Sequence, residues 1–335
     1  MTDIRHFREA RRPRAPHLAA VFAALLALAP AASLPAQGVL QGRVVQGERG
    51  VAGAAVELHR VTPGARGVAA RATSGADGSF RVTLPPPDTA GFTVFFATAW
   101  KDGVRYFGRA LHPEETPGDY RIAVFDTTAS AAAADSVRVT RRDVFFIPAM
   151  DGGWEVAELV RVRNQAGRTL VSADRPVVGF TLPAGVASFE SGSGDAAADS
   201  ARGQDGGVAR MGDRVWVTDP LVPGERDFFF RYRLGAGRGK LALPLAQATD
   251  TLNLYVRQPS PEVDVAGLLG GTPFEAEGER FLRYSGQDLR AGAPVSLDWS
   301  VPSESPVDPR IVAVALAGLI LAGGAALAAR RRPAA

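Results

Sequence analysis

The sequence predicts an all-β protein with two tandem β-sandwich domains, an N-terminal signal peptide and one C-terminal transmembrane α-helix. Short runs that alternate large apolar with polar residues recur between turns. The chain of 335 residues contains 37 glycines and 24 prolines, which are typical of turns. The longest uncharged apolar runs lie near the two ends of the chain. The predicted segments are a signal peptide (1–37), a first sandwich (38–127), a linker (128–136), a second sandwich (137–302), a stalk (303–310), a transmembrane helix (311–329) and a cytoplasmic tail (330–335).

The composition excludes several classes of function. The chain has no cysteine, which rules out disulfides, thiolate nucleophiles, iron–sulfur clusters and cysteine zinc sites. The formal net charge is +3, but arginines before residue 15 and at 330–332 account for the excess. The body between them is mildly acidic, so no nucleic-acid partner is expected.

The N-terminal run predicts export. Leu18–Ala29 is uncharged and almost wholly apolar, follows an arginine-rich stretch and precedes Pro30 and small residues. At 1.5 Å per residue this helix would reach only about 18 Å, which is too short to span a bilayer comfortably. Cleavage after Ser33, Ala36 or Gln37 is left open, and an uncleaved signal anchor is the alternative.

The C-terminal run predicts the membrane anchor. Ile311–Ala329 carries no charge, would form about 28 Å of helix, and is followed at once by Arg330–Arg332. The positive-inside rule places this tail in the cytoplasm and the body outside it. A buried core helix is the alternative, as is a sorting signal that is removed after export.

The compartment follows from the same features. A cysteine-free exported body in which neither Asn164 nor Asn253 lies in a glycosylation sequon is typical of bacteria. We therefore expect a single-pass protein of the bacterial cytoplasmic (inner) membrane, anchored in the lipid bilayer through 311–329. Its body would face the periplasm if the cell has two membranes.

Alternating strands dominate the first predicted domain. Tyr120, Ile122 and Val124 share one face of a strand, and Lys101–Gly103 predicts a tight hairpin turn because Asp-Gly tolerates positive φ. One face of the run 92–100 carries Phe92, Val94, Phe96, Thr98 and Trp100.

The stretches LQGRVVQGERGVAGAAVELHRV and TSGADGSFRVTLPP carry a family resemblance over 38–127. This part is similar to the carboxypeptidase regulatory-like domain, a transthyretin-like module with a starch-binding-like fold. The resemblance implies a binding or spacer module without peptidase activity, although Ala52 stands where the family usually has proline. The matching residues are Gly42, Val44, Gly53, Ala54, Val56, Leu58, Thr73, Asp77, Gly78 and Phe80.

The second predicted domain is also β-rich but resembles no family sharply. The runs 228–234 and 295–301 alternate regularly, whereas the strand 154–164 loses its alternation near Glu158. Small polar residues predict a flexible loop at Ser188–Gly207. A helical turn across the alanines of the preceding linker is compatible with its composition.

No constellation in the sequence predicts catalysis, a metal site or a cofactor. His59 and His112 lack metal-ligand spacing, and Gly235–Lys240 departs from the phosphate-loop pattern, which predicts a glycine-rich hairpin loop instead. The serines offer no nucleophile motif, so a Ser-His-Asp hydrolase is only formally open. Glu275, Glu277 and Glu279 predict solvated charge, and a Lys–Asn crosslink is not expected with two residues of each type.

The function predicted is therefore binding. We expect a non-enzymatic, membrane-anchored extracytoplasmic protein that binds or organises a partner at the bacterial cell envelope, the partner being an unidentified envelope protein or polysaccharide. The alternative is a membrane-tethered carbohydrate-binding module. The candidate ligand-binding residues are Trp100, Tyr106 and Phe107, with core packing as the favoured interpretation of these aromatics.

Overall fold

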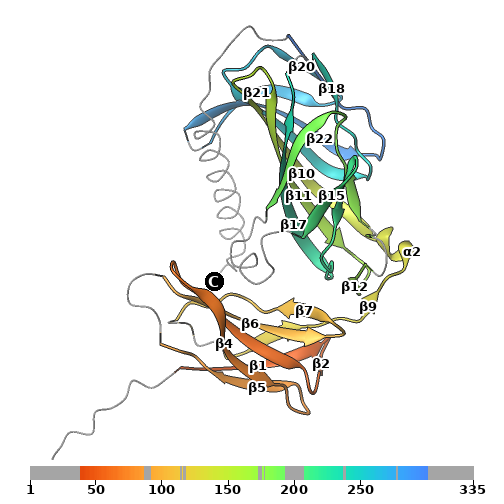
Figure 1. Ribbon diagram of the computed structural model, residues 1–335. Helices are drawn as coiled ribbons and strands as arrows, with labels where there is room; N and C mark the ends of the chain where they lie inside the picture. Colours follow the sequence, from red (N-terminus) through yellow and green to blue (C-terminus); the bar gives the residue numbers. More distant parts are fainter. Residues whose placement is uncertain are drawn as a thin grey trace, which may run out of the picture.

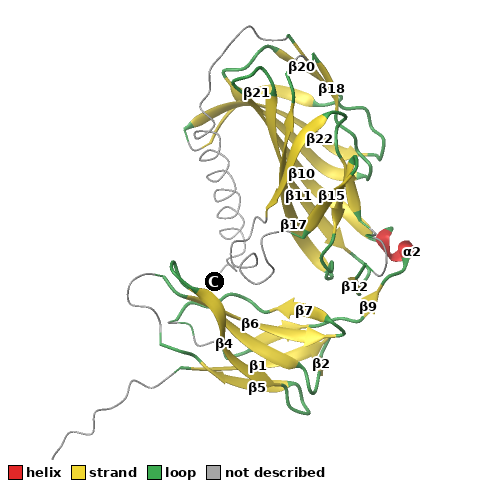
Figure 2. Ribbon diagram, in the orientation of Figure 1, coloured by secondary structure: helices red, strands yellow, loops and turns green. Residues whose placement is uncertain are grey.

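In the residues that it describes, the computed structural model is all-β with one short helix (Figure 2). The predicted signal peptide, stalk, transmembrane helix and tail lie outside the residues it describes. Within that described part, no helix has the length and apolarity needed to cross a membrane. The described residues are 38–86, 92–113, 115, 118–172, 176, 178–192, 207–236, 239–276 and 278–300.

The first region (residues 38–126) consists of two sheets that enclose one hydrophobic core (Figure 1). One sheet is centred on β1 (Val39–Gln46), with β2 (Arg49–Gly50) and β5 (Ser79–Thr83) antiparallel to it and β8 (Tyr120–Ala123) parallel. The other has the order β4-β3-β6-β7. Its strands are β3 (Ala55–Val61), β4 (Arg66–Thr73), β6 (Val94–Lys101) and β7 (Val104–Phe107).

Two local predictions for this region are confirmed. Lys101 pairs with Val104 across a two-residue hairpin, and both Asp102 (φ 50°) and Gly103 (φ 75°) have the positive φ that such a turn requires. Tyr120 and Ile122 are fully buried. The Tyr120 hydroxyl donates to the Arg109 carbonyl (2.7 Å), and burial raises the pKa of this tyrosine to about 12.

The second region contains a seven-stranded sheet with the order β14-β17-β11-β10-β19-β22-β21. One face of it packs against two three-stranded sheets, β13-β16-β15 and β18-β23-β20, around the larger core. The strands of the large sheet are β10 (Val137–Pro148), β11 (Trp154–Asn164), β14 (Val186–Gly192), β17 (Gly224–Leu234), β19 (Thr249–Gln258), β21 (Leu269–Ala276) and β22 (Glu279–Leu289). Those of the smaller sheets are β13 (Gly179–Thr181), β15 (Val208–Met211), β16 (Arg214–Val217), β18 (Lys240–Ala242), β20 (Val263–Ala266) and β23 (Ser296–Trp299).

Short elements lie between the two regions. The predicted helical turn across the alanines is α2 (Ala131–Ala134), and β9 (Thr127–Thr128) pairs in parallel with β12 (Thr169–Leu170). The Tyr106 hydroxyl of the first region lies 3.0 Å from the Thr169 hydroxyl of the second. The two regions are thus joined by hydrogen bonds as well as by the covalent chain.

Two loop predictions for the second region need correction. Of the predicted loop Ser188–Gly207, residues 188–192 belong to edge strand β14, where Phe189 packs 5.8 Å from Phe230 and a bulge follows Val186, and residues 193–206 lie outside the described part. Small polar residues are tolerated there because an edge strand has one open side. The segment Gly235–Lys240 is not a hairpin loop, since it leads from β17 to β18, which belong to different sheets.

The irregular alternation near Glu158 has a specific cause. Glu158 lies on the core face of β11, is fully buried, and accepts two hydrogen bonds from Arg142, from Nε (2.7 Å) and Nη2 (3.1 Å). The Tyr232 hydroxyl donates to the same carboxylate (2.8 Å), and Arg142 Nη1 donates to the Pro244 carbonyl (2.9 Å). Burial alone lowers the pKa of Arg142, but the Glu158 charge outweighs it and the pKa is raised.

Candidate functional site

The candidate site lies on the outer face of the β4-β3-β6-β7 sheet. Along β6, Phe95, Ala97 and Ala99 enter the core, so Phe96 and Trp100 lie on the opposite face, where Phe96 is covered (4% exposed) and Trp100 is exposed (37%). The face that the sequence marks as aromatic is therefore the outer one. The core side of this strand carries Ala97 and Ala99 beside Phe95.

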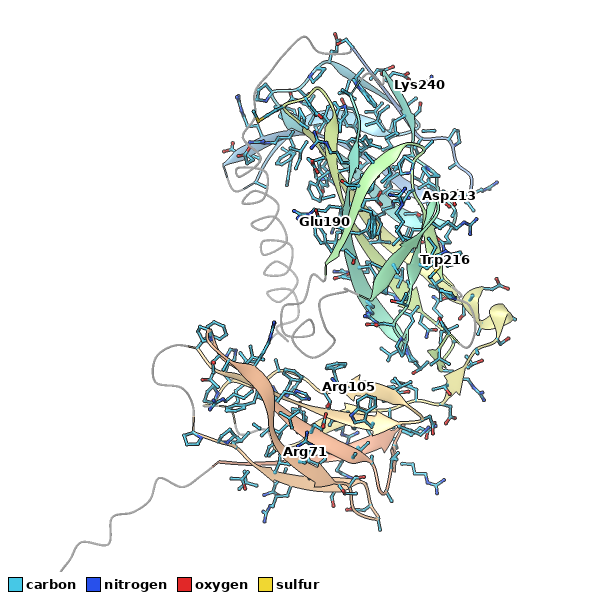
Figure 3. The ribbon with its side chains drawn as sticks, viewed as in Figure 1. Arg71, Arg105, Glu190, Asp213, Trp216 and Lys240 are labelled. Atoms are coloured by element: carbon cyan, nitrogen blue, oxygen red, sulfur yellow. The ribbon has the colours of Figure 1, made fainter. Side chains whose placement is uncertain are left out.

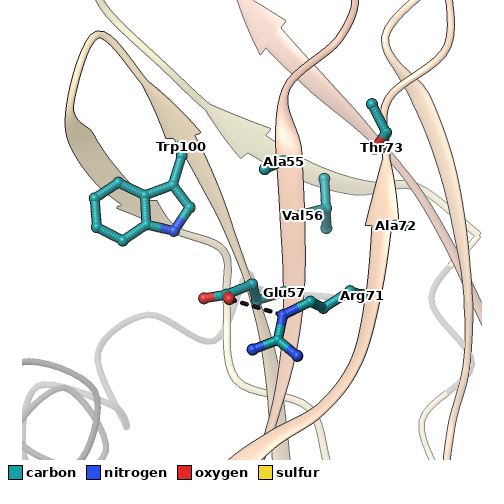
Figure 4. Close-up of a pocket in the computed structure, with 7 residues that line it drawn as sticks. All are labelled: Ala55, Val56, Glu57, Arg71, Ala72, Thr73 and Trp100. Carbon is teal, nitrogen blue, oxygen red and sulfur yellow. Dashed lines mark hydrogen bonds and ion pairs between the residues drawn. The ribbon is translucent and has the colours of Figure 1, made fainter.

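A surface pocket of 520 Å³ lies beside Trp100 (Figure 4). Trp100 is 37% exposed, and the neighbouring strands present the small residues Ala55 and Thr73, which pair with each other. Small side chains next to a large ring leave a shallow hollow that is widely open to solvent. The lining residues are Ala55, Val56, Glu57, Arg71, Ala72, Thr73 and Trp100.

Charged groups surround the Trp100 ring. Arg71 Nε donates to Glu57 Oε1 (3.2 Å), and these residues pair directly across β3 and β4. The Glu57 side chain is only 17% exposed, whereas that of Arg71 is 72% exposed, so the guanidinium can reach a ligand. On the other side, the Arg105 guanidinium lies over the Trp100 ring at 4.5 Å from its centroid (Arg71 and Arg105 are labelled in Figure 3).

His59 packs against Phe96 next to this surface. Its ring stacks on Phe96 (4.8 Å, 3° between planes), and its Nε2 lies 3.2 Å from the Thr98 hydroxyl and 3.8 Å from Glu57 Oε2. Burial lowers the pKa of His59, and the positive charge of Arg105 lowers it further. The imidazole is therefore neutral at pH 7, and its contacts are those of a packed side chain.

This pKa shift predicts a pH dependence of stability. Because the pKa of His59 is lower in the folded than in the unfolded chain (about 6.5), the unfolded state binds more protons below pH 7. The His59 contribution to the free energy of unfolding should therefore fall between pH 7 and pH 5. Urea unfolding at both pH values should show a smaller loss for His59→Gln than for the unchanged protein. His112→Gln, at an exposed position, is the control, and equal losses in all three proteins would contradict the assignment.

The structure separates the three sequence candidates. Tyr106 is 2% exposed in the core, and its hydroxyl donates to the Phe125 carbonyl (2.9 Å), so it cannot share a surface platform with Trp100. Phe107 is half-buried, 6.1 Å from Phe96. Only Trp100 lines the pocket.

The other residues weighed in the sequence take structural positions. Lys101 forms ion pairs with Asp102 (2.7 Å) and Asp126 (3.0 Å), while the Asn164 amide donates to the Arg168 and Leu221 carbonyls (2.8 Å each). In the described ranges, no three histidine, aspartate or glutamate side chains gather in a way that could hold a metal ion.

Comparisons with known proteins leave the family open. No known protein family and no curated protein matches the sequence. Among solved structures, the M1 zinc metallopeptidase from Deinococcus radiodurans has 14% identity and a TM-score of 0.29, covering 50% of this chain and 45% of that chain. A mutant of that enzyme gives a TM-score of 0.30 at the same identity and coverage.

TM-scores and identities this low give no information about the activity of this protein. The chain spans less than half the length of these metallopeptidases, and the likeness concerns only part of the β structure. The resemblance of 38–127 to the carboxypeptidase regulatory-like domain is not confirmed by the comparisons and stays a prediction.

Proposed function

We propose that the protein is a non-enzymatic binding protein, anchored in the bacterial cytoplasmic membrane, that contacts an envelope partner through the pocket beside Trp100. The observation that carries the proposal is the combination of an exposed indole, a half-buried carboxylate and an exposed guanidinium around one hollow. Aromatic residues and arginine are the side chains that contribute most to binding surfaces.

The chemistry of the pocket supports binding rather than catalysis. The Glu57 carboxylate is engaged by Arg71, so it is a hydrogen-bonding group and an ion-pair partner rather than a free base. Thr73 is the one hydroxyl among the lining residues, and no histidine lines the pocket beside it. A nucleophile activated by a base is therefore missing from this hollow.

The proposed anchoring in the membrane rests on the C-terminal apolar run of the sequence. The apolar run 311–329 is long enough to span, and the arginines after it favour a cytoplasmic tail. The stalk is short, so the second region would stay near the bilayer and the first region, with the Trp100 pocket, would extend outward.

A carbohydrate is the second candidate for the partner. The face of the Trp100 ring that the Arg105 guanidinium does not cover is a flat apolar surface on which the apolar face of a sugar can stack. Glu57 and Arg71 lie beside that ring and would provide an acceptor and donors for sugar hydroxyls.

The test is retention of the purified full-length chain, in detergent, on starch, chitin and peptidoglycan. If a polysaccharide is the partner, Trp100→Ala should reduce retention about tenfold or more, since loss of one stacking anchor costs on the order of 2 kcal/mol. Met211→Ala is the control, because Met211 is exposed but lies in the second region. Retention that is unchanged in Trp100→Ala would remove the pocket from the proposal.

A protein partner is tested in cells with a photo-crosslinking amino acid at position 100 and, as the control, at position 211. Adducts are expected at position 100 alone, and Arg71→Ala should reduce their yield. Equal adducts at both positions, or none at position 100 together with no polysaccharide retention, would overturn the proposed contact site.

A further inference from the structure

The seven-stranded sheet has a second apolar surface, on the face opposite its core. Along β19, Leu252, Leu254 and Val256 enter the core, so Tyr255 and Arg257 point to the other face. Four aromatic side chains gather there, which we call the aromatic patch. Its members are Phe145, Tyr255, Phe274 and Phe281.

The patch is closely packed within one sheet. Phe145 stacks on Tyr255 (4.6 Å between centroids, 9° between planes), and Phe274 lies 5.3 Å from Tyr255 and 6.5 Å from Phe281. Among the described residues, the ring contacts of the patch all join strands of this sheet. Tyr255 (5% exposed) and Phe281 (1%) are buried, whereas Phe145 and Phe274 are half-buried and leave apolar area that another chain segment could cover.

Two guanidinium groups beside the patch have unused donors. Arg257 is 8% exposed and donates through Nε to Glu279 (2.7 Å), but its buried Nη1 has no hydrogen-bond partner. Arg283 donates through Nη2 to the Asn253 side chain (3.1 Å), and its buried Nε also lacks a partner. A buried donor without a partner costs on the order of 1–3 kcal/mol, so acceptor oxygens are the expected complement.

The described chain ends near the end of the large sheet at which Arg257 lies. Trp299, next to the last described residue, pairs with Val263 and lies 5.5 Å from the ring of Trp154. Trp154 pairs with Pro148 at the end of β10, two residues beyond Phe146, which pairs with Val256 next to Arg257. The following chain thus starts at the Arg257 end of the sheet, from the layer that covers the opposite face.

The next ten residues, VPSESPVDPR (301–310), have the complementary chemistry. Prolines at 302, 306 and 309 favour an extended backbone with free carbonyls, and Glu304 and Asp308 supply carboxylates. Proline-rich segments bind aromatic surfaces in this conformation. At about 3.1 Å per residue, an extended segment 301–310 would reach about 31 Å from Ser300, which exceeds the roughly 20 Å from the layer of β23, past the large sheet, to a segment packed on its opposite face.

We propose that residues 301–310 dock in extended form on the aromatic patch, with Glu304 and Asp308 facing Arg257 and Arg283. The segment that the sequence predicts to be a stalk is then part of an intramolecular contact. Docking would fix the orientation of the second region relative to whatever follows residue 310. The proposal does not depend on the ligand of the Trp100 pocket.

The absence of cysteine permits a direct test in the full-length protein. Thr272 is exposed and pairs with Arg283 beside the patch, whereas Met211 is exposed on the small sheet β13-β16-β15. The pair Thr272→Cys/Ser305→Cys should form an intramolecular disulfide under mild oxidation several-fold faster than the control pair Met211→Cys/Ser305→Cys. Adding Glu304→Gln and Asp308→Asn to the first pair should slow its formation several-fold.

Other results would overturn the proposal. Equal rates for the two pairs would show that residue 305 has no preferred contact. Disulfide-linked dimers from the single variant Thr272→Cys, at a rate above that of Met211→Cys, would assign the patch to a second copy of the chain. Faster crosslinking in Thr272→Cys/Gly318→Cys than in Thr272→Cys/Ser305→Cys would assign it to the apolar run 311–329.

Discussion

Replacing Glu158 by alanine is expected to lower the free energy of unfolding by about 3–5 kcal/mol, because it leaves the buried Arg142 guanidinium without its carboxylate. Arg142 would retain only its hydrogen bond to the Pro244 carbonyl, and Tyr232 would lose the acceptor of its hydroxyl. Urea unfolding of the purified full-length chain, followed by circular dichroism, measures the change.

Two matched variants separate the buried charge from the loss of volume. Tyr232→Phe removes one hydroxyl and should cost only about 1 kcal/mol. The double variant Arg142→Met/Glu158→Leu removes both charges and should recover most of the stability lost in Glu158→Ala. A Glu158→Ala protein within 1 kcal/mol of the parent would show that this pair does not determine the stability of the sheet.

Deletion of residues 311–329 is expected to move the protein from the membrane fraction to the soluble exported fraction. The nineteen uncharged residues 311–329, which three arginines follow, are the only membrane-spanning segment that we predict in the mature chain. Fractionation of cells with carbonate washing measures the distribution.

The control replaces 311–329 with nineteen leucines, which should keep the protein in the membrane because length and apolarity are preserved. If the deletion variant stays in the membrane fraction, the anchor lies elsewhere, for example in an uncleaved N-terminal run.

Local features of the fold could be predicted from the sequence. The Asp102-Gly103 hairpin follows from φ preferences. The alternation in 228–234 predicts a strand, and the structure has β17 there with Phe228, Phe230, Tyr232 and Leu234 buried. These predictions depend on neighbours in the chain, which explains their success.

Features that depend on strand register could not be predicted. Arg71 meets Glu57, and Arg142 meets Glu158, because two strands pair in one particular register. The sequence offers one signal for the second pair, a charged residue on the apolar face of 154–164, but it does not identify the partner. For the pocket, the sequence marks Trp100 but not Glu57 or Arg71. Core packing is the favoured interpretation of all three aromatics, and it applies to Tyr106 but not to the exposed Trp100.

The order of strands within the large sheet could not be predicted from local sequence either. Parallel pairing of β10 with β19 joins residues more than a hundred positions apart. Phe145 and Tyr255, which form the centre of the aromatic patch, are brought together only by this pairing. No periodicity in either strand indicates it.

Site-directed cysteine labelling tests the exported, membrane-anchored arrangement most directly. One variant carries Met211→Cys, at an exposed site of the second region, and another carries Pro333→Cys in the tail after the arginines. In intact spheroplasts, a membrane-impermeant maleimide should label Met211→Cys fully and Pro333→Cys only after lysis. Labelling of both variants before lysis, or of neither, would contradict the predicted topology.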